Sequence, residues 1–166
     1  RAINLRSFPI NYTLFVTSGS YFTANKYHYR RELRYVLYKY ENYLRAKARQ
    51  PLLSPDECTN VFRDVSVSNT LDHITPQTPD FVEYSEEFCN EYLNNIGNLS
   101  LLTWGNNSAK KNHNPANDGV VEMYNSIFYS HKEIYETLKS EKKWNEIQIS
   151  ERRDRIVAFI KDNWLD

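Results

Sequence analysis

The sequence alternates between segments with apolar residues every three or four positions and one central segment where they occur every second position. The first spacing is typical of one face of a helix, and the second of a strand. We therefore expect helices over about 27–47, 81–96, 120–138 and 149–164, and a strand within 64–75. Only 4 glycines occur among 166 residues, which favours packed helices over a glycine-rich β-architecture.

Short sequence motifs predict where individual helices and turns begin and end. Ser54-Pro55-Asp56-Glu57 has the pattern of a capping box and predicts a short helix to about Phe62. Gly97 stands where a left-handed residue would end the 81–96 helix. Residues 98–102 form a short β-prone segment, and residues 106–114 are polar enough to be a helix or an ordered turn at a site. The length suits one domain with a sizeable core.

No apolar run is long enough to span a membrane, so we expect no membrane contact. The chain begins at Arg1 without an apolar targeting segment, from which we expect a cytoplasmic protein and a piece of a longer one.

Charge is unevenly distributed although the formal net charge is zero. Residues 26–49 carry eight Lys or Arg against two acidic residues, whereas residues 52–100 carry nine acidic residues against Arg63 alone. Such a chain can present a basic face to a polyanion, although charged helices are also often plain solvated surface. The candidate nucleic-acid contacts on this basic stretch are Arg31, Arg34 and Arg45.

One set of polar residues has the chemistry of phosphodiester hydrolysis. Asp72 and His73 are adjacent, and Asn107 follows in the polar 106–114 segment. A neutral imidazole takes a proton from water, and a hard divalent ion bound by carboxylate and amide oxygens offsets the charge of the transition state. We therefore expect His73 to be the general base, and Asp72 and Asn107 to bind the metal. Because neighbouring side chains on a strand point to opposite faces, the backbone must twist or bulge for both to serve one site.

The wider pattern is Asp72-His73-Ile74-Thr75-Pro76, then Asn98-Leu99-Ser100-Leu101-Leu102, then Asn107 nine residues after Asn98 and Lys110 three beyond. It resembles the HNH (His-Me finger, ββα-metal) nucleases, and most of all the C-terminal nuclease domain of GmrSD-type, modification-dependent restriction endonucleases and related phage-defence nickases. The resemblance extends over most of residues 30–165, including the Trp144…Arg152…Trp164 segment.

The resemblance implies a mainly α single domain with a small embedded ββα-metal (HNH) core that cuts or nicks DNA. It implies that Asn98 holds the loop behind the catalytic His73, and that Lys110 and Lys111 contact phosphate. The expected cofactor is Mg²⁺, or Mn²⁺ or Ni²⁺. The expected partners are the DNA backbone and an N-terminal ATPase-like sensor domain. The expected division is a lead-in segment 1–25 and a nuclease domain 26–166, made of a helical flank 26–62, a ββα-metal core 64–117 and C-terminal helices 118–166.

The chain departs from many HNH enzymes because Thr103 and Asn106 stand where a second CxxC pair would bind structural zinc. We therefore expect no structural zinc. Asn106, Asn112 and Asn114 compete with Asn107 for the ligand role, and His113 is a reserve contact.

Two other functions remain open. One is a nucleic-acid-binding regulatory module with a degenerate nuclease site, and the other is an RNA-directed nuclease that uses the same residues. Contacts to phosphates alone do not separate DNA from RNA.

Overall fold

The computed structural model describes residues 30–54, 56–57, 71–102 and 104–164. Within these ranges two strands and a majority of helical residues form a single domain, in agreement with the expected fold class at this level. The elements, in chain order, are α2 (Arg30–Lys47), β1 (Leu71–His73), α4 (Glu86–Glu91), η4 (Ile96–Asn98), β2 (Leu99–Leu101), α5 (Trp104–Lys110), α6 (Asp118–Glu122), α7 (Tyr129–Glu141) and α8 (Glu146–Trp164).

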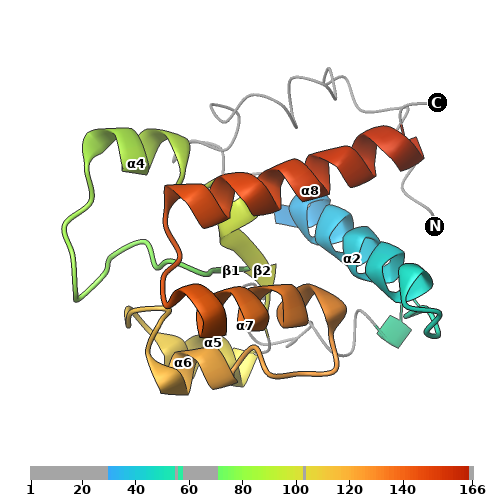
Figure 1. Cartoon of the computed structure of the whole chain (residues 1–166), viewed down its shortest axis with the longest axis horizontal. Helices are drawn as coiled ribbons and strands as arrows, with labels where there is room; N and C mark the ends of the chain where they lie inside the picture. Colours follow the sequence, from blue (N-terminus) through green and yellow to red (C-terminus); the bar gives the residue numbers. More distant parts are fainter. Residues whose placement is uncertain (1–29, 55, 58–70, 103, 165–166) are drawn as a thin grey trace.

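The two strands lie at the centre of the molecule, with the long helices α2, α7 and α8 around them (Figure 1). They are antiparallel, and Leu71 pairs with Leu101, Asp72 with Ser100 and His73 with Leu99. All six strand residues are buried. Because β1 carries Asp72 and His73, this small sheet places the centre of the predicted site inside the helical shell.

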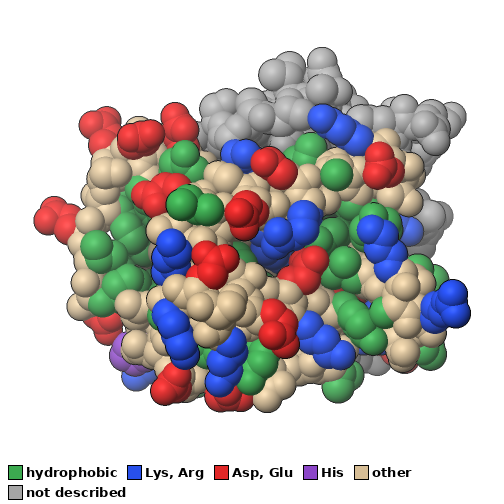
Figure 2. Space-filling view, in the orientation of Figure 1, with side chains coloured by type: hydrophobic (Ala, Val, Ile, Leu, Met, Phe, Trp, Pro, Cys, Tyr) green, Lys and Arg blue, Asp and Glu red, His purple; other side chains and the backbone are tan. Residues whose placement is uncertain are grey.

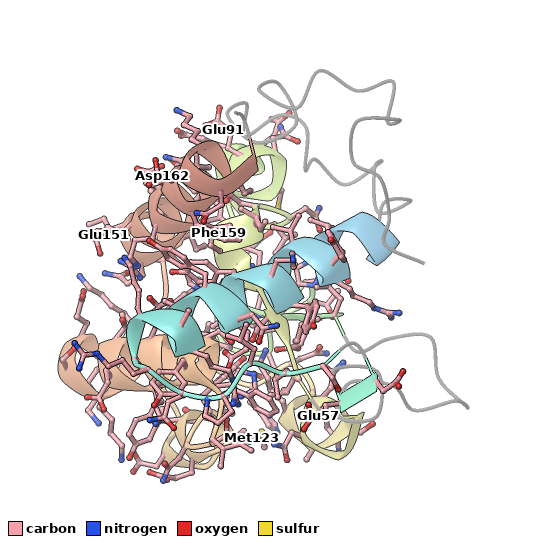
Figure 3. The ribbon with its side chains drawn as sticks, turned by 90° about the vertical axis from the view of Figure 1, so that its right-hand side faces the viewer. Glu57, Glu91, Met123, Glu151, Phe159 and Asp162 are labelled. Atoms are coloured by element: carbon pink, nitrogen blue, oxygen red, sulfur yellow. The ribbon has the colours of Figure 1, made fainter. Side chains whose placement is uncertain are left out.

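One apolar cluster joins α2 to the strands and to α8. It is built from Leu33, Val36, Leu37, Tyr40, Leu71, Ile96, Leu99, Leu101, Phe128, Ile156, Val157, Phe159 and Ile160. Figure 3 shows Phe159 of α8 close to α2, where its ring centroid lies 5.5 Å from that of Tyr40 and 4.9 Å from that of Tyr43. The three- and four-residue spacing in α2 and α8 therefore marks the faces that these helices bury against each other.

A second cluster lies under the remaining helices. It contains Ile74, Phe88, Leu93, Leu102, Val120, Val121, Tyr124, Ile134, Leu138, Trp144 and Ile149. Ile74 directly follows β1, and Leu102 directly follows β2, so the sheet is anchored in both clusters. The strands are held by packing at both of their ends.

Two sequence-based expectations for the 81–98 segment are wrong. The helix there is only α4, and Phe81 is 39% exposed. Gly97 does not adopt a left-handed conformation; it lies in η4 against α8. A Cβ atom at Gly97 would lie 1.9 Å from the carbonyl oxygen of Ile149. The glycine is thus required by a close approach of two backbones, not by its φ angle.

The helix expected over 120–138 is also wrong in part, since it is two helices, α6 and α7. The apolar residues keep their three- and four-residue spacing between the two helices, so the sequence shows no break there. In the structure the Ser126 hydroxyl accepts a hydrogen bond from the backbone N–H of Phe128 at 3.1 Å, and Ile127 is 73% exposed. The apolar pattern therefore continues through a turn.

Several local expectations are confirmed. The N–H of Ser54 donates to Glu57 Oε2 at 2.7 Å, and the N–H of Glu57 donates to Ser54 Oγ at 3.1 Å, which is the capping box. β2 and α5 fall in the segments expected to be a strand and a helix or turn. The continuation of the helix to Phe62 and the strand residues 64–70 lie outside the described residues.

In the described part of the chain, no helix combines the length and the apolar character that a membrane span needs.

Candidate active site

Lys110 connects β1, which carries Asp72 and His73, to α5, which carries Asn107. Its ammonium donates a 2.7 Å hydrogen bond to Asp72 Oδ2, and it also donates to the backbone carbonyl of His73. The lysine is 1% exposed, and burial lowers the pKa of its ammonium while Asp72 opposes that shift. Residues 38 positions apart in the chain are therefore held together in the interior. Contact between this ammonium and a phosphate would require these bonds to open.

Asp72 has a second buried donor. The Tyr124 hydroxyl donates to the same oxygen, Oδ2, at 3.0 Å. Burial, together with the charge of Asp72, raises the pKa of Tyr124 well above its usual value, so the phenol stays a neutral donor. Asp72 is 6% exposed, and these two donors fix the orientation of its carboxylate.

His73 is oriented by an amide that the sequence did not single out. Its Nε2 atom lies 2.9 Å from Oδ1 of Asn94, and both residues are buried. The Asp72 side chain thus engages Lys110 and Tyr124, and the His73 side chain engages Asn94.

Asn98 holds the loop that follows His73. Its side-chain oxygen accepts from the N–H of Thr75 at 2.8 Å, and its amide nitrogen donates to the carbonyls of Thr75 at 3.0 Å and Leu93 at 2.8 Å. Asn98 is fully buried, and its backbone carbonyl accepts from Ile74. This is the tie behind His73 that the resemblance implied, and a role for Asn98 in catalysis stays a prediction.

Asn107 lies on α5, three residues before Lys110 and so on the same side of that helix. Its side chain is half-buried. The competing Asn106 stands four residues before Lys110, and its amide nitrogen donates to the carbonyl of Met123 at 3.5 Å. Figure 3 places Met123 at the lower edge of the molecule. Both asparagines therefore lie on the side of α5 that carries Lys110, and the choice of Asn107 as the metal ligand stays a prediction from its position nine residues after Asn98.

Lys111 and His113 lie at the surface beyond α5. Lys111 is exposed and adopts a left-handed conformation with φ of 49° at the end of the helix. His113 Nδ1 lies 2.9 Å from Asp80 Oδ2, and both side chains are about half exposed. Of these residues, Lys111 has the exposure that a phosphate contact needs.

The three arginines of the basic stretch differ in their surroundings. Arg45 donates to Glu41 Oε1 at 2.8 Å and to the carbonyl of Pro51, with 12% of its side chain exposed. Arg34 is half-buried on α2, and the side chain of Arg31 lies outside the described part. In Figure 2 acidic side chains gather over α4, whereas basic side chains are spread over this face, with some at the C-terminal end of α2.

No group of three or more His, Cys, Asp and Glu that could hold a metal ion occurs within residues 30–54, 56–57, 71–102 and 104–164. A metal ion at this site would therefore need amide, water or phosphate oxygens beside Asp72.

Sequence reasoning missed three buried partners of the site. Asn94 left no signal in the spacing of the motif. Tyr124 falls within the helix expected over 120–138 and was not considered for the site, although a fully buried tyrosine needs a partner for its hydroxyl. Arg152 was part of the resemblance, but its contact with the site was not expected; it stands between Ile149 and Ile156 on the apolar face of α8. Its Nη1 atom donates to the carbonyls of Ile96, Gly97 and Leu99.

Comparison with known families finds one match over most of the chain. The family model described as GmrSD restriction endonucleases, C-terminal domain, matches residues 19–159. No curated protein and no solved structure matches the chain. The matched span contains Asp72, His73, Asn98, Asn107 and Lys110, and it covers most of the sequence.

Proposed function

The chain belongs to the family of GmrSD restriction endonuclease C-terminal domains, and from that premise we propose that it hydrolyses phosphodiester bonds of DNA at a site formed by Asp72, His73 and Asn107. The family makes it a nuclease domain of the restriction-endonuclease type. The HNH mechanism, the metal dependence and nicking of DNA are our proposal. The observation that carries it is the pair of bonds from Lys110 to Asp72 and to His73, which brings α5 and β1 together.

The donor set fits a hard divalent cation such as Mg²⁺, Mn²⁺ or Ni²⁺. Asp72 supplies a buried carboxylate whose orientation is fixed through Oδ2, and Asn107 supplies an amide oxygen from the same side of α5 as Lys110. A cation bound there would offset the negative charge that develops on the phosphate. Asp72 and Asn107 are the residues that would hold it.

His73 acts as the general base. It takes a proton from a water molecule whose oxygen attacks phosphorus, and the bond from phosphorus to the leaving oxygen of the sugar breaks. The leaving oxygen is protonated by solvent. Lys110 contributes by holding Asp72 and the backbone of His73, and Asn98 by holding the loop at Thr75. Both are positioning residues.

Lys111 and the basic residues of α2 would bind the DNA backbone. Lys111 is exposed next to the site, and Arg31, Arg34 and Arg45 belong to the basic helix α2. Because such contacts go to phosphates, they would fix the position of the duplex without reading its sequence. Binding would weaken steeply with salt.

The test of the metal site compares Asn107→Ala with Asn106→Ala in a supercoiled plasmid assay with each of the three cations. Asn107→Ala should raise the Mn²⁺ concentration needed for half-maximal cleavage about 10-fold or more, and Asn106→Ala should cleave like the wild type. EDTA should abolish cleavage. Cleavage that survives chelation, or an effect of Asn106 in place of Asn107, would reject the ligand assignment.

A second candidate is a regulatory DNA-binding module with a degenerate site. The observation in its favour is that the Asp72 carboxylate already has a buried lysine as its counter-charge. This candidate predicts retention of DNA at low salt without cleavage in any of the three cations. A parallel digest of RNA separates the RNA-directed nuclease, which would use the same residues.

A further inference from the structure

The hydrogen bond between His73 and Asn94 determines which nitrogen of the imidazole carries the proton. Nε2 of His73 lies 2.9 Å from Oδ1 of Asn94, with 6% and 5% of the two residues exposed. An amide oxygen can only accept a hydrogen bond, so Nε2 must donate. In the neutral ring the lone pair is then on Nδ1.

The backbone on both sides of Asn94 is fixed. The carbonyl of Leu93 accepts from Asn98 at 2.8 Å, and the side chain of Asn95 accepts from the N–H of Gly97 at 3.0 Å. Arg152 of α8 donates to the carbonyls of Ile96 and Gly97 from the other side. The amide of Asn94 therefore reaches His73 from a rigid segment.

Packing does not explain why an asparagine stands at this position. The Nδ2 atom of Asn94 is buried and has no hydrogen-bond partner among the residues that the structure describes. A buried amide donor without a partner lowers the stability of a fold, and an apolar side chain of similar size would avoid that cost. What the side chain does provide is an acceptor for His73.

We propose that Asn94 is a positioning residue that holds His73 as the Nε2-protonated tautomer, with Nδ1 as the atom that receives the proton from water. The proposal rests on the nuclease function proposed above. Asn94 acts through His73 and needs no contact with DNA. Asn94 is not part of the motif formed by Asp72-His73, Asn98, Asn107 and Lys110.

The test uses Asn94→Leu, which removes the acceptor, and Asn94→Asp, which keeps an oxygen in its place. Asn90→Leu is the matched control, because it makes the same change at an exposed position of α4. The tautomer of His73 is read from the ¹⁵N signals of its ring in the whole chain, assigned by their loss in His73→Gln. Plasmid cleavage with Mn²⁺ gives kcat and KM for each variant.

Asn94→Leu should lose the single Nε2-protonated form, and its kcat should fall about 10- to 100-fold while KM changes less than about 2-fold. Asn94→Asp should restore the tautomer and most of kcat, and Asn90→Leu should match the wild type. An Asn94→Leu variant that keeps the Nε2-protonated ring, or cleaves at the wild-type rate, would overturn the proposal.

The two readouts separate this inference from the proposed function. If the wild type shows the expected tautomer, lost in Asn94→Leu, but cleaves no plasmid in any cation, the nuclease proposal fails and the role of Asn94 in orienting His73 stands. If the wild type cleaves and His73 is protonated at Nδ1, the nuclease proposal stands and the role of Asn94 fails.

Discussion

Single residues decide how closely the elements around the site approach one another. Gly97 in η4 touches the backbone of α8, where a Cβ atom would lie 1.9 Å from the Ile149 carbonyl oxygen and 2.9 Å from the backbone nitrogen of Arg153. Asn94, Asn98 and the carbonyls that Arg152 binds lie within five residues of this contact along the chain. The contact therefore sets the position of the segment that orients His73.

Gly97→Ala should lower the free energy of unfolding by about 3 kcal/mol, because the clash is with backbone atoms that no rotamer change can relieve. Urea unfolding monitored by circular dichroism measures the change. Gly119→Ala is the control: a Cβ atom there meets nothing within 4 Å, so its stability should stay the same or rise by up to about 1 kcal/mol. Equal stabilities of the two variants would contradict the close approach.

At the scale of the elements, α2 supplies the cap of α7. Helix α7 has no side-chain cap of its own, and the Glu41 carboxylate accepts from the N–H groups of Tyr129 at 3.0 Å and Ser130 at 2.8 Å. Glu41 is 1% exposed and also binds Arg45. A buried negative charge at the positive end of a helix is favourable.

Glu41→Gln should therefore lower the free energy of unfolding by about 1–3 kcal/mol, since the amide nitrogen cannot accept and one buried N–H is left unsatisfied. The comparison variant is Glu136→Gln on the exposed side of α7, which should change stability by less than about 0.5 kcal/mol. A loss of stability no larger in Glu41→Gln than in Glu136→Gln would show that the cap contributes nothing.

The long helices were predictable because the spacing of their apolar residues marks the face that each helix buries. Val36 and Leu37 in α2 and Ile156 and Ile160 in α8 are examples. The break between α6 and α7 was not, because the apolar spacing continues through it and the cap comes from Glu41, 88 residues away in the chain. The position of a helix end thus depended on a distant partner that the local pattern does not contain.

The same distinction holds for the site. Asp72, His73, Asn98 and Lys110 were proposed from the motif and the resemblance that it carries, and Asn98 bonds the loop at Thr75 as the resemblance implied; the functional roles of all four stay predictions. The interior position of Lys110 was not foreseen, because lysine is rarely fully buried unless it is paired. Which amide would meet His73 depended on the path of the 92–97 segment.

At the scale of the whole molecule, His131 links α7 to the sheet. It is 2% exposed, its Nε2 donates to the carbonyl of Leu101, and the Ser126 hydroxyl donates to its Nδ1 at 2.8 Å. Burial lowers its pKa below the usual value of 6.5. The imidazole is therefore neutral in the folded protein over a wider pH range than in the unfolded chain.

The sign of the pH dependence follows from that shift. Above about pH 6.5 both states hold a neutral His131 and the residue contributes no pH dependence; as the pH falls below 6.5, the unfolded chain takes up the proton first, and folding stability decreases. As the pH is lowered below about 6.5, the free energy of unfolding should thus fall more steeply in the wild type than in His131→Gln. Parallel curves for the two proteins would contradict the buried neutral imidazole.

The account as a whole depends on His73 as the base of a metal-dependent phosphodiester cleavage. The most direct measurement is the rate at which supercoiled plasmid is nicked or cut with Mg²⁺, Mn²⁺ or Ni²⁺ by the wild type, by His73→Ala and by His113→Ala, the half-exposed histidine beyond α5. His73→Ala should fold and retain DNA but cleave about 100-fold to 10⁴-fold more slowly, and His113→Ala should cleave like the wild type. Cleavage by His73→Ala at the wild-type rate would contradict the account.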